Sequence, residues 1–155
     1  MLSPEKQLAI AIKIASETHV DQFDKGGKPY ILHPIHLMQQ LLFDLELAAI
    51  AVLHDVIEDS QGVVDAEYLR RQGLSERVIV AVELLTHKKG QSYLTSYIPS
   101  ICENYDAVRV KRKDLEHNSN ITRLKGVREK DLRRIEKYHK AFSLLSEAKQ
   151  KFIME

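Results

Sequence analysis

The chain has 155 residues, a formal net charge of +1 and one cysteine, which fits a single globular domain and excludes a disulfide within the chain. A net charge near zero gives no bulk attraction to nucleic acid. The N-terminus lacks a signal-peptide pattern and the longest apolar run is seven residues, so we expect a cytoplasmic protein without a membrane span.

Nearly every segment of the chain has the pattern of a helix. Ser3 followed by Pro4 predicts a helix start, and apolar residues then recur at helical spacing up to His19. His19 lies on that apolar stripe, so we expect it to be a buried, hydrogen-bonded core residue. The glycines and lysines of residues 24–29 predict a loop, after which a second helix is expected at about residues 33–43.

The rest of the chain is also expected to be helical, because no run of residues alternates with period two. A third helix is expected at about residues 45–57, capped by Asp44. The helices expected after it lie at about residues 65–73, capped by Asp65; 75–85, capped by Ser75; 93–104, interrupted at Pro99; 107–118, capped by Asp106; and 130–149. The last of these is expected to carry one stripe formed by Leu132, Ile135, His139, Phe142 and Leu145. The sequence therefore predicts one all-α domain over residues 1–155, a bundle of about seven to nine helices.

Four titratable side chains follow the apolar run of residues 47–53: His54, Asp55, Glu58 and Asp59. Charges at the edge of a core are tolerated mainly when they pair or bind a metal. If the third helix continues through them, Glu58 lies one turn beyond His54, and Asp59 one turn beyond Asp55. One segment then offers an imidazole and a carboxylate to a metal, with two more carboxylates one turn on.

Two further residues complete a ligand set. His33 precedes Pro34 at the mouth of the second helix, and Asp114 lies one turn before Asn118. Together with His54 and Asp55 they offer imidazole and carboxylate groups that suit Mn, Fe, Zn, Co or Ni, and the set itself does not choose among these metals. Taken singly, each has a structural interpretation: His33 as a helix cap, and Asp114 as a partner of a neighbouring cation.

The order His33, His54-Asp55, Asp114 resembles the H…HD…D signature of HD-domain metal-dependent phosphohydrolases. Residues 27–34 (GKPYILHP), 53–59 (LHDVIED) and 110–118 (VKRKDLEHN) are similar to segments of the RelA/SpoT-type (p)ppGpp hydrolase branch. A fourth similarity is the pattern of Ala15 to His19 followed by Gln22. The resemblance covers most of the chain and implies a single HD domain.

The resemblance implies a role for each matching residue. One divalent metal, commonly Mn²⁺, would be held by His33, His54, Asp55 and Asp114. Glu58 and Asp59 would orient and deprotonate the attacking water, Asn118 would contact the nucleotide, and Thr86 would lie near the base pocket. The branch often has arginine in the loop after Gln22, where this chain offers Lys25 and Lys28, and small apolar residues before the aspartate ligand, where it has Lys113. We expect these three lysines to neutralise substrate phosphates.

The expected activity is metal-dependent hydrolysis of a guanosine 3′-diphosphate 5′-polyphosphate, which releases pyrophosphate and GDP or GTP. Two alternatives stay open: an HD-domain phosphohydrolase of another nucleotide, such as a nucleoside monophosphate, and a nucleotide- or metal-binding module without turnover. The expected partner is a small nucleotide. The basic run of residues 111–113 has no interleaved aromatics, which argues against nucleic acid, and a homo-oligomer is left open. No synthetase domain fits beside the expected domain in 155 residues.

Overall fold

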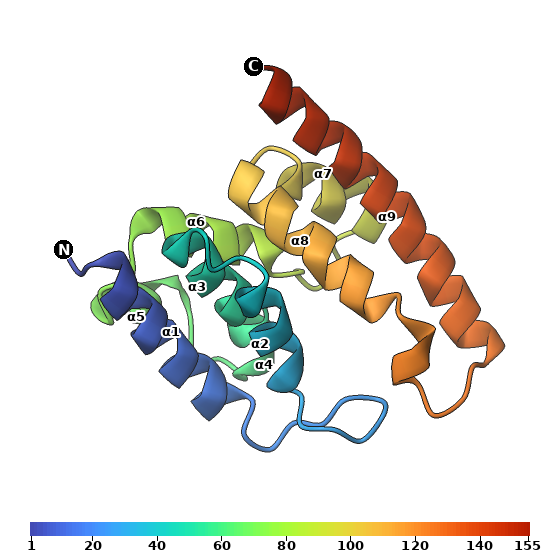
Figure 1. Ribbon diagram of the computed structural model, residues 1–155, viewed down its shortest axis with the longest axis horizontal. Helices are drawn as coiled ribbons and strands as arrows, with labels where there is room; N and C mark the ends of the chain where they lie inside the picture. The colour runs from blue at the N-terminus through green and yellow to red at the C-terminus, as the bar shows by residue number, and fades with distance from the viewer.

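The structure is a computed structural model that describes residues 1–155, and it is helical throughout, as expected (Figure 1). Its only extended pairing is an isolated bridge between Phe23 and Pro29. No helix is both long enough and apolar enough to cross a membrane. The elements are α1 (Pro4–Thr18), α2 (Leu32–Gln39), α3 (Leu45–Leu53), α4 (Val56–Asp59), α5 (Ala66–Arg71), α6 (Glu76–Leu85), a π-helical turn (Tyr93–Tyr97), α7 (Ile98–Ile101), α8 (Tyr105–Asn118), a 3₁₀ turn (Ile121–Arg123) and α9 (Glu129–Met154).

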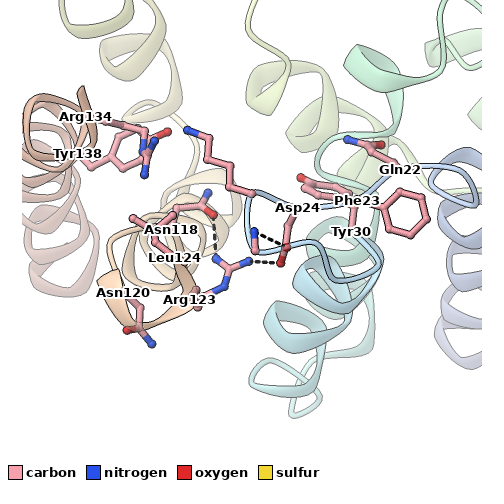
Figure 2. A pocket seen from close by; sticks show the side chains of 12 residues that line it. Gln22, Phe23, Asp24, Tyr30, Asn118, Asn120, Arg123, Leu124, Arg134 and Tyr138 are labelled. Carbon is pink, nitrogen blue, oxygen red and sulfur yellow. Dashed lines mark hydrogen bonds and ion pairs between the residues drawn. The ribbon is translucent and has the colours of Figure 1, made fainter. Parts of the chain in front are cut away.

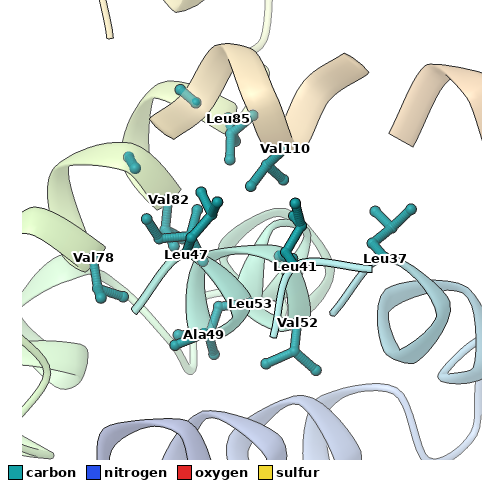
Figure 3. Close-up of a cluster of buried hydrophobic side chains, with 14 of the residues drawn as sticks. Leu37, Leu41, Leu47, Ala49, Val52, Leu53, Val78, Val82, Leu85 and Val110 are labelled. Carbon is teal, nitrogen blue, oxygen red and sulfur yellow. The ribbon is translucent and has the colours of Figure 1, made fainter. Parts of the chain in front are cut away.

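Helix α3 is the centre of the core. Every residue from Leu47 to Leu53 has no solvent-exposed surface, as expected for a helix that is apolar on all sides. Helices α1, α2, α6 and α8 pack around it, and Figure 3 shows side chains of α2, α6 and α8 converging on α3. The long helix α9 packs along α8 and α7 and adds Ala141 and Leu145 to the core (Figure 1). The polar residues that follow α3 therefore emerge directly from the centre of the domain.

Local hydrogen bonds start most helices where the sequence places them. The side chains of Ser3, Asp44, Asp65 and Ser75 each accept a backbone N–H of the helix that follows, which confirms these four expected caps. The expected cap Asp106 is wrong. Asn104 caps α8 instead, so that helix begins two residues earlier than expected. Asp106 lies in the first turn of α8, where a carboxylate is favourable because of the helix dipole. Its side chain forms ion pairs with Arg77 and Arg109 instead of capping the helix.

The expected continuous helix over residues 45–57 is interrupted. Helix α3 ends at Leu53 with His54 as its C-cap, Asp55 has a non-helical backbone (φ −110°, ψ 3°), and α4 begins at Val56. The carbonyl of Asp55 accepts a hydrogen bond from the N–H of Asp59, the last residue of α4, so Asp55 is tied to the helix that follows it. His54 and Asp55, the two residues at the break, are consequently not on the face of one continuous helix. Their side chains still contact each other at the buried site described below.

Pro99 divides the expected helix of residues 93–104, as predicted. It lacks an N–H and occupies the second position of α7, directly after the π-helical turn. The stripe expected on the last helix is partly wrong, because Leu132 and His139 are exposed. The inward stripe of α9 instead contains Tyr138, Ala141 and Leu145.

Arg77 of α6 joins three elements through ion pairs. Its guanidinium nitrogens lie 2.7 Å from Asp44, 3.2 Å from Glu46 and 2.8 Å from Asp106. Burial opposes ionisation of Asp44 and Asp106, but hydrogen bonds from Arg77 outweigh it and hold the pKa of both carboxyl groups below the usual value. This network is the clearest electrostatic link between α3, α6 and α8.

We expect Arg77→Ala to lower the free energy of unfolding by about 1 kcal/mol at pH 7. A carboxylate with a lowered folded-state pKa stabilises the fold above its unfolded pKa of about 3.9, and that contribution is lost as the pH falls through the folded-state pKa. The difference between variant and wild type should therefore be smaller at pH 3. Denaturant unfolding at both pH values measures it, and an equal difference at both would contradict the assignment.

Candidate metal centre and adjoining pocket

Three buried side chains from three helices converge on one point. His33 lies in the first turn of α2, His54 at the end of α3 and Asp114 on α8. One nitrogen or oxygen from each lies within 4.8 Å of the others. We call this group the His33–His54–Asp114 cluster. It brings together three of the four expected ligands, from positions 81 residues apart along the chain.

His54 provides the test of whether a metal fits. Its Nδ1 lies 2.8 Å from the Ala51 carbonyl oxygen and must donate to it, so the lone pair is on Nε2 in the neutral ring. Nε2 is fully buried without a hydrogen-bond partner, yet it lies 3.1 Å from Asp55 Oδ2 and 3.5 Å from Asp114 Oδ1. A lone pair facing two carboxylates is favourable only if a positive charge lies between them.

The charges around His54 also favour a positive charge at this position. Burial lowers the pKa of His54, but the charges of Asp55 and Asp114 outweigh burial and raise it well above the usual value. Either a second proton on the ring or a metal ion supplies the missing positive charge. Imidazole nitrogens and carboxylate oxygens are the donor set of divalent first-row metals, so these residues fit such an ion.

His33 is held from both sides of its ring. Its Nε2 lies 2.8 Å from Asp114 Oδ1, and its Nδ1 lies 2.6 Å from Nδ1 of His117. Burial is the largest cause that lowers the pKa of His117, to about 4, so His117 is neutral near pH 7 and its Nδ1 can accept a hydrogen bond from the Nδ1–H of His33. With Nδ1 donating, Nε2 of His33 is the free ligand atom. A second hydrogen bond of this kind orients most metal-binding histidines.

Asp114 connects the cluster to a buried cation and to an amide. Its Oδ1 accepts a hydrogen bond of 2.8 Å from Asn118 Nδ2, while its Oδ2 lies 2.8 Å from the ammonium of Lys111. Lys111 is itself largely buried, and its ammonium lies over the Tyr97 ring. The ion pair with Lys111 therefore orients Asp114 and leaves Oδ1 toward the two histidines.

The remaining acidic residues surround the cluster. The Tyr30 hydroxyl donates to Asp55, which lies beside the cluster through its contact with His54. Glu58 accepts the backbone N–H of His87, and Asp59 accepts Gln22 Nε2 at 3.0 Å. Burial is the largest cause that raises the pKa of both Glu58 and Asp59, which makes each a better proton acceptor than an ordinary exposed carboxylate.

A pocket of about 250 Å³ lies next to the cluster (Figure 2). Figure 2 shows Arg134 and Tyr138 of α9 facing Asp24, Phe23 and Tyr30 across it. We call it the cationic pocket. Its charged lining residues are Asp24, Lys25, Arg123 and Arg134, and Tyr30 and Asn118 connect it to Asp55 and Asp114.

Positive charge dominates the cationic pocket. Burial is the largest cause that lowers the pKa of Lys25, and the nearby Arg134 lowers it further, as expected where two cations lie close together. Arg123 donates to Asn118 Oδ1 at 3.2 Å and forms a 3.5 Å ion pair with Asp24. Asn118 also holds Asp114, so one amide joins the pocket to the cluster. An anionic group in the pocket and a group at the cluster could belong to one molecule.

No protein-family model matches the chain. The bifunctional (p)ppGpp synthase/hydrolase SpoT of Escherichia coli is 28% identical over 123 residues, which cover 73% of this chain and 18% of SpoT. The guanosine-3′,5′-bis(diphosphate) 3′-pyrophosphohydrolase of Aquifex aeolicus is 36% identical over 85 residues, 52% of this chain and 12% of that protein. The chain thus spans less than a fifth of the length of the curated relatives that it matches.

A solved structure has a similar fold. It is that of a metazoan orthologue of SpoT that hydrolyses ppGpp, with a TM-score of 0.74 and 20% identity, covering 94% of this chain and 88% of the other. This chain is a distant homologue of the SpoT-type (p)ppGpp hydrolase domain. The predicted resemblance to that branch and the predicted helical architecture are both confirmed.

In this SpoT-like chain, the expected substrate contacts divide into two groups. Lys25 and Asn118 line the cationic pocket. The other three do not. Lys28 is exposed and is bound to Asp24 only through its backbone, and the Thr86 hydroxyl donates to the Val82 carbonyl. Lys113 lies 3.5 Å from Glu116 on the outer side of α8, because helical geometry directs it away from Asp114, the residue that follows it.

Arg123 and Arg134 line the cationic pocket of this chain, and the sequence analysis missed both. The resemblance places an arginine in the loop after Gln22. In this chain the two arginines that line the pocket lie instead in the segment after α8 and in α9. Arg134 and Tyr138 lie one turn apart and continue the inward stripe of Ala141 and Leu145. A polar and aromatic pair that extends an apolar stripe is the signal by which Arg134 could have been found.

Proposed function

We propose that the chain is a metal-dependent hydrolase that cleaves a guanosine 3′-diphosphate 5′-polyphosphate into pyrophosphate and GDP or GTP. The observation that carries the proposal is that the His33–His54–Asp114 cluster adjoins the cationic pocket, with Asn118 hydrogen-bonded into both. Homology to SpoT-type hydrolases supports it, as does the SpoT orthologue with the same fold. Residues 1–155 would act as one catalytic domain.

The metal proposed here is one divalent ion, Mn²⁺, held by His33, His54, Asp114 and the adjacent Asp55. Such an ion supplies Lewis-acid stabilisation of phosphoryl oxygens and makes water easier to deprotonate. Lys111 keeps Asp114 ionised and in place, and His117 keeps the ligand nitrogen of His33 free of its proton. These contacts set the geometry that the ion would require.

The other residues of the chain account for binding and proton transfer. Lys25, Arg123 and Arg134 place positive charge where the polyphosphate groups of the nucleotide would lie, and arginine can hold a phosphate through two hydrogen bonds. Asp59, with Glu58 beside it, would accept the proton of the attacking water. The phosphoester bond to the 3′ oxygen breaks, pyrophosphate leaves with the oxygen of water, and the ribose oxygen takes up a proton.

The proposal is tested by incubating purified, Mn²⁺-loaded protein with ppGpp and measuring release of GDP and pyrophosphate, with EDTA as control. EDTA-sensitive release of both products supports it. Hydrolysis of a nucleoside monophosphate with ppGpp left intact would assign the protein to another HD-type substrate. Binding of ppGpp and metal without turnover would overturn the enzymatic proposal in favour of a binding module.

We expect Arg134→Ala to raise KM for ppGpp by about 10- to 100-fold, which corresponds to the loss of one charged hydrogen-bonding group. Steady-state kinetics measure this. Arg133→Ala is the matched control, because Arg133 is the neighbour of Arg134 on α9 but is 69% exposed, against 17% for Arg134. Equal KM values for the two variants would remove Arg134 from the substrate site.

A further inference from the structure

Asp59 is held by a contact from outside its own helix. Gln22, in the segment after α1, donates from Nε2 to Asp59 Oδ2 at 3.0 Å, across 37 residues of sequence. Gln22 lines both the cationic pocket and the outer hollow that contains Glu58 and Asp59. Its side chain therefore lies between the place proposed for the nucleotide and the carboxylate proposed to activate water.

The direction of the Gln22 amide is determined by His19. Nδ1 of His19 lies 2.8 Å from Gln22 Oε1. An amide oxygen only accepts hydrogen bonds, so Nδ1 must carry the proton and donate. With its oxygen held in this way, the amide turns its NH₂ group toward Asp59. The alternative orientation would set two oxygens, those of Gln22 and Asp59, against each other.

His19 is built into the core at this point. Its residue surface is 1% exposed, its ring packs edge-on against Tyr30, and its Nε2 is buried without a hydrogen-bond partner. An unprotonated Nε2 is consistent with the proton being on Nδ1. Tyr30 in turn donates to Asp55. One buried histidine thus lies behind side chains that contact both Asp55 and Asp59.

We propose that Gln22, oriented by His19, is a positioning residue that directs the Asp59 carboxylate toward the attacking water. The inference rests on the proposed function, because it concerns the same reaction. A neutral amide suits this role because it aligns the carboxylate by one hydrogen bond without the added charge of a lysine or arginine, which would weaken Asp59 as a proton acceptor. By contrast, Asp44 and Asp106 are held by the positively charged guanidinium of Arg77.

The first test is a mutant cycle between Gln22 and Asp59. Gln22→Ala should lower kcat by about 10- to 100-fold, a part of the effect typical of general base catalysis, while metal content and the melting temperature stay close to wild type. Gln22→Glu should lower kcat further, because two carboxylates then face each other. In an Asp59→Asn background, Gln22→Ala should cost no further activity. Gln72→Glu, an exposed position on α5's C-terminal end, is the matched control.

The second test separates orientation by His19 from simple core packing. The side-chain NH₂ of asparagine can take the place of the Nδ1–H of histidine, whereas leucine fills the volume without a donor. We expect His19→Asn to retain most of the wild-type kcat and His19→Leu to match Gln22→Ala. If both lower the melting temperature equally and kcat equally, His19 has only a structural role and its part of the proposal is overturned.

A third readout does not depend on the substrate. In protein labelled with ¹⁵N histidine, His19 should show the neutral Nδ1–H tautomer at pH 8, and Gln22→Ala should remove that preference. If wild-type protein leaves ppGpp intact, the proposed function fails on that result alone, and the variants are then compared on bis-p-nitrophenyl phosphate. The opposite tautomer, or a Gln22→Ala loss that persists in Asp59→Asn protein, would overturn the positioning role.

Discussion

Asp114→Asn should abolish metal binding at stoichiometric Mn²⁺ and lower the rate of ppGpp hydrolysis by about 10⁴-fold or more, the loss expected when several kcal/mol of metal-derived stabilisation disappear. Asparagine keeps the shape of the side chain and its bond to Asn118. It removes the negative charge that His33 and His54 share at 2.8 and 3.5 Å. Metal analysis of the purified variant and steady-state kinetics measure the two effects.

The matched control is Asp106→Asn, on the same helix. Asp106 is also an ion-paired aspartate, but its partners are Arg77 and Arg109, outside the cluster. This variant should retain full metal content and activity at a small cost in stability. Wild-type metal content in Asp114→Asn would show that the cluster is not the metal site.

Asp114→Asn should also lower the stability of the fold, because Lys111 loses its ion-pair partner. Its side chain is 12% exposed, and its ammonium has Asp114 as its one ion-pair partner. Removing that partner leaves a buried charge uncompensated, at a cost of about 3–5 kcal/mol in unfolding free energy. Adding Lys111→Met to Asp114→Asn should restore much of the stability but none of the activity. The double variant therefore separates loss of chemistry from loss of fold.

Asp59→Asn should have the next largest effect, lowering kcat by about 10²- to 10⁴-fold with metal content unchanged. The asparagine side chain can still accept a hydrogen bond from Gln22 but cannot take a proton from water. Asp59 is 27% exposed at the side chain and belongs to a short helix, so the substitution should leave the melting temperature nearly unchanged.

Single-turnover rates for Asp59→Asn, Glu58→Gln and Asp21→Asn measure how the two carboxylates share the proton transfer. Asp21 is the control, since it is exposed and lines the same outer hollow as Glu58 and Asp59. Full activity of Asp59→Asn together with inactive Glu58→Gln would transfer the role of proton acceptor to Glu58. Full activity of both would show that neither carboxylate accepts the proton.

Much of the fold was predictable because its causes are local. The Ser3, Asp44 and Ser75 caps form between residues three positions apart, and Pro99, which has no N–H to donate to the preceding turn, lies at the start of α7. The break between α3 and α4 was not predictable in this way. Residues 45–57 have a helical pattern throughout, and the interruption at Asp55 occurs where its side chain contacts Tyr30 and His54.

The cationic pocket shows the same limit for the site. Lys113 and Arg134 are both cations on helices. The apolar stripe that Arg134 extends places it on the inner face of α9, but the stripe does not show what that face contacts. Lys113 faces outward because it precedes Asp114, whose side chain points inward on the same helix, whereas Arg134 enters the pocket because α9 packs against α8. Only the packing of the two helices decides which charge a substrate can reach.

The sequence by itself determined the all-helical class, most helix starts and the order of the histidines and aspartates that converge on the cluster, because each depends on residue type and short spacing. The tertiary structure alone decided which cations line the pocket and that Gln22 holds Asp59. Gln22 and Asp59 are 37 residues apart, and Lys25 lies far along the chain from Arg123 and Arg134. Their geometry follows from how the helices pack, which no short-range pattern encodes.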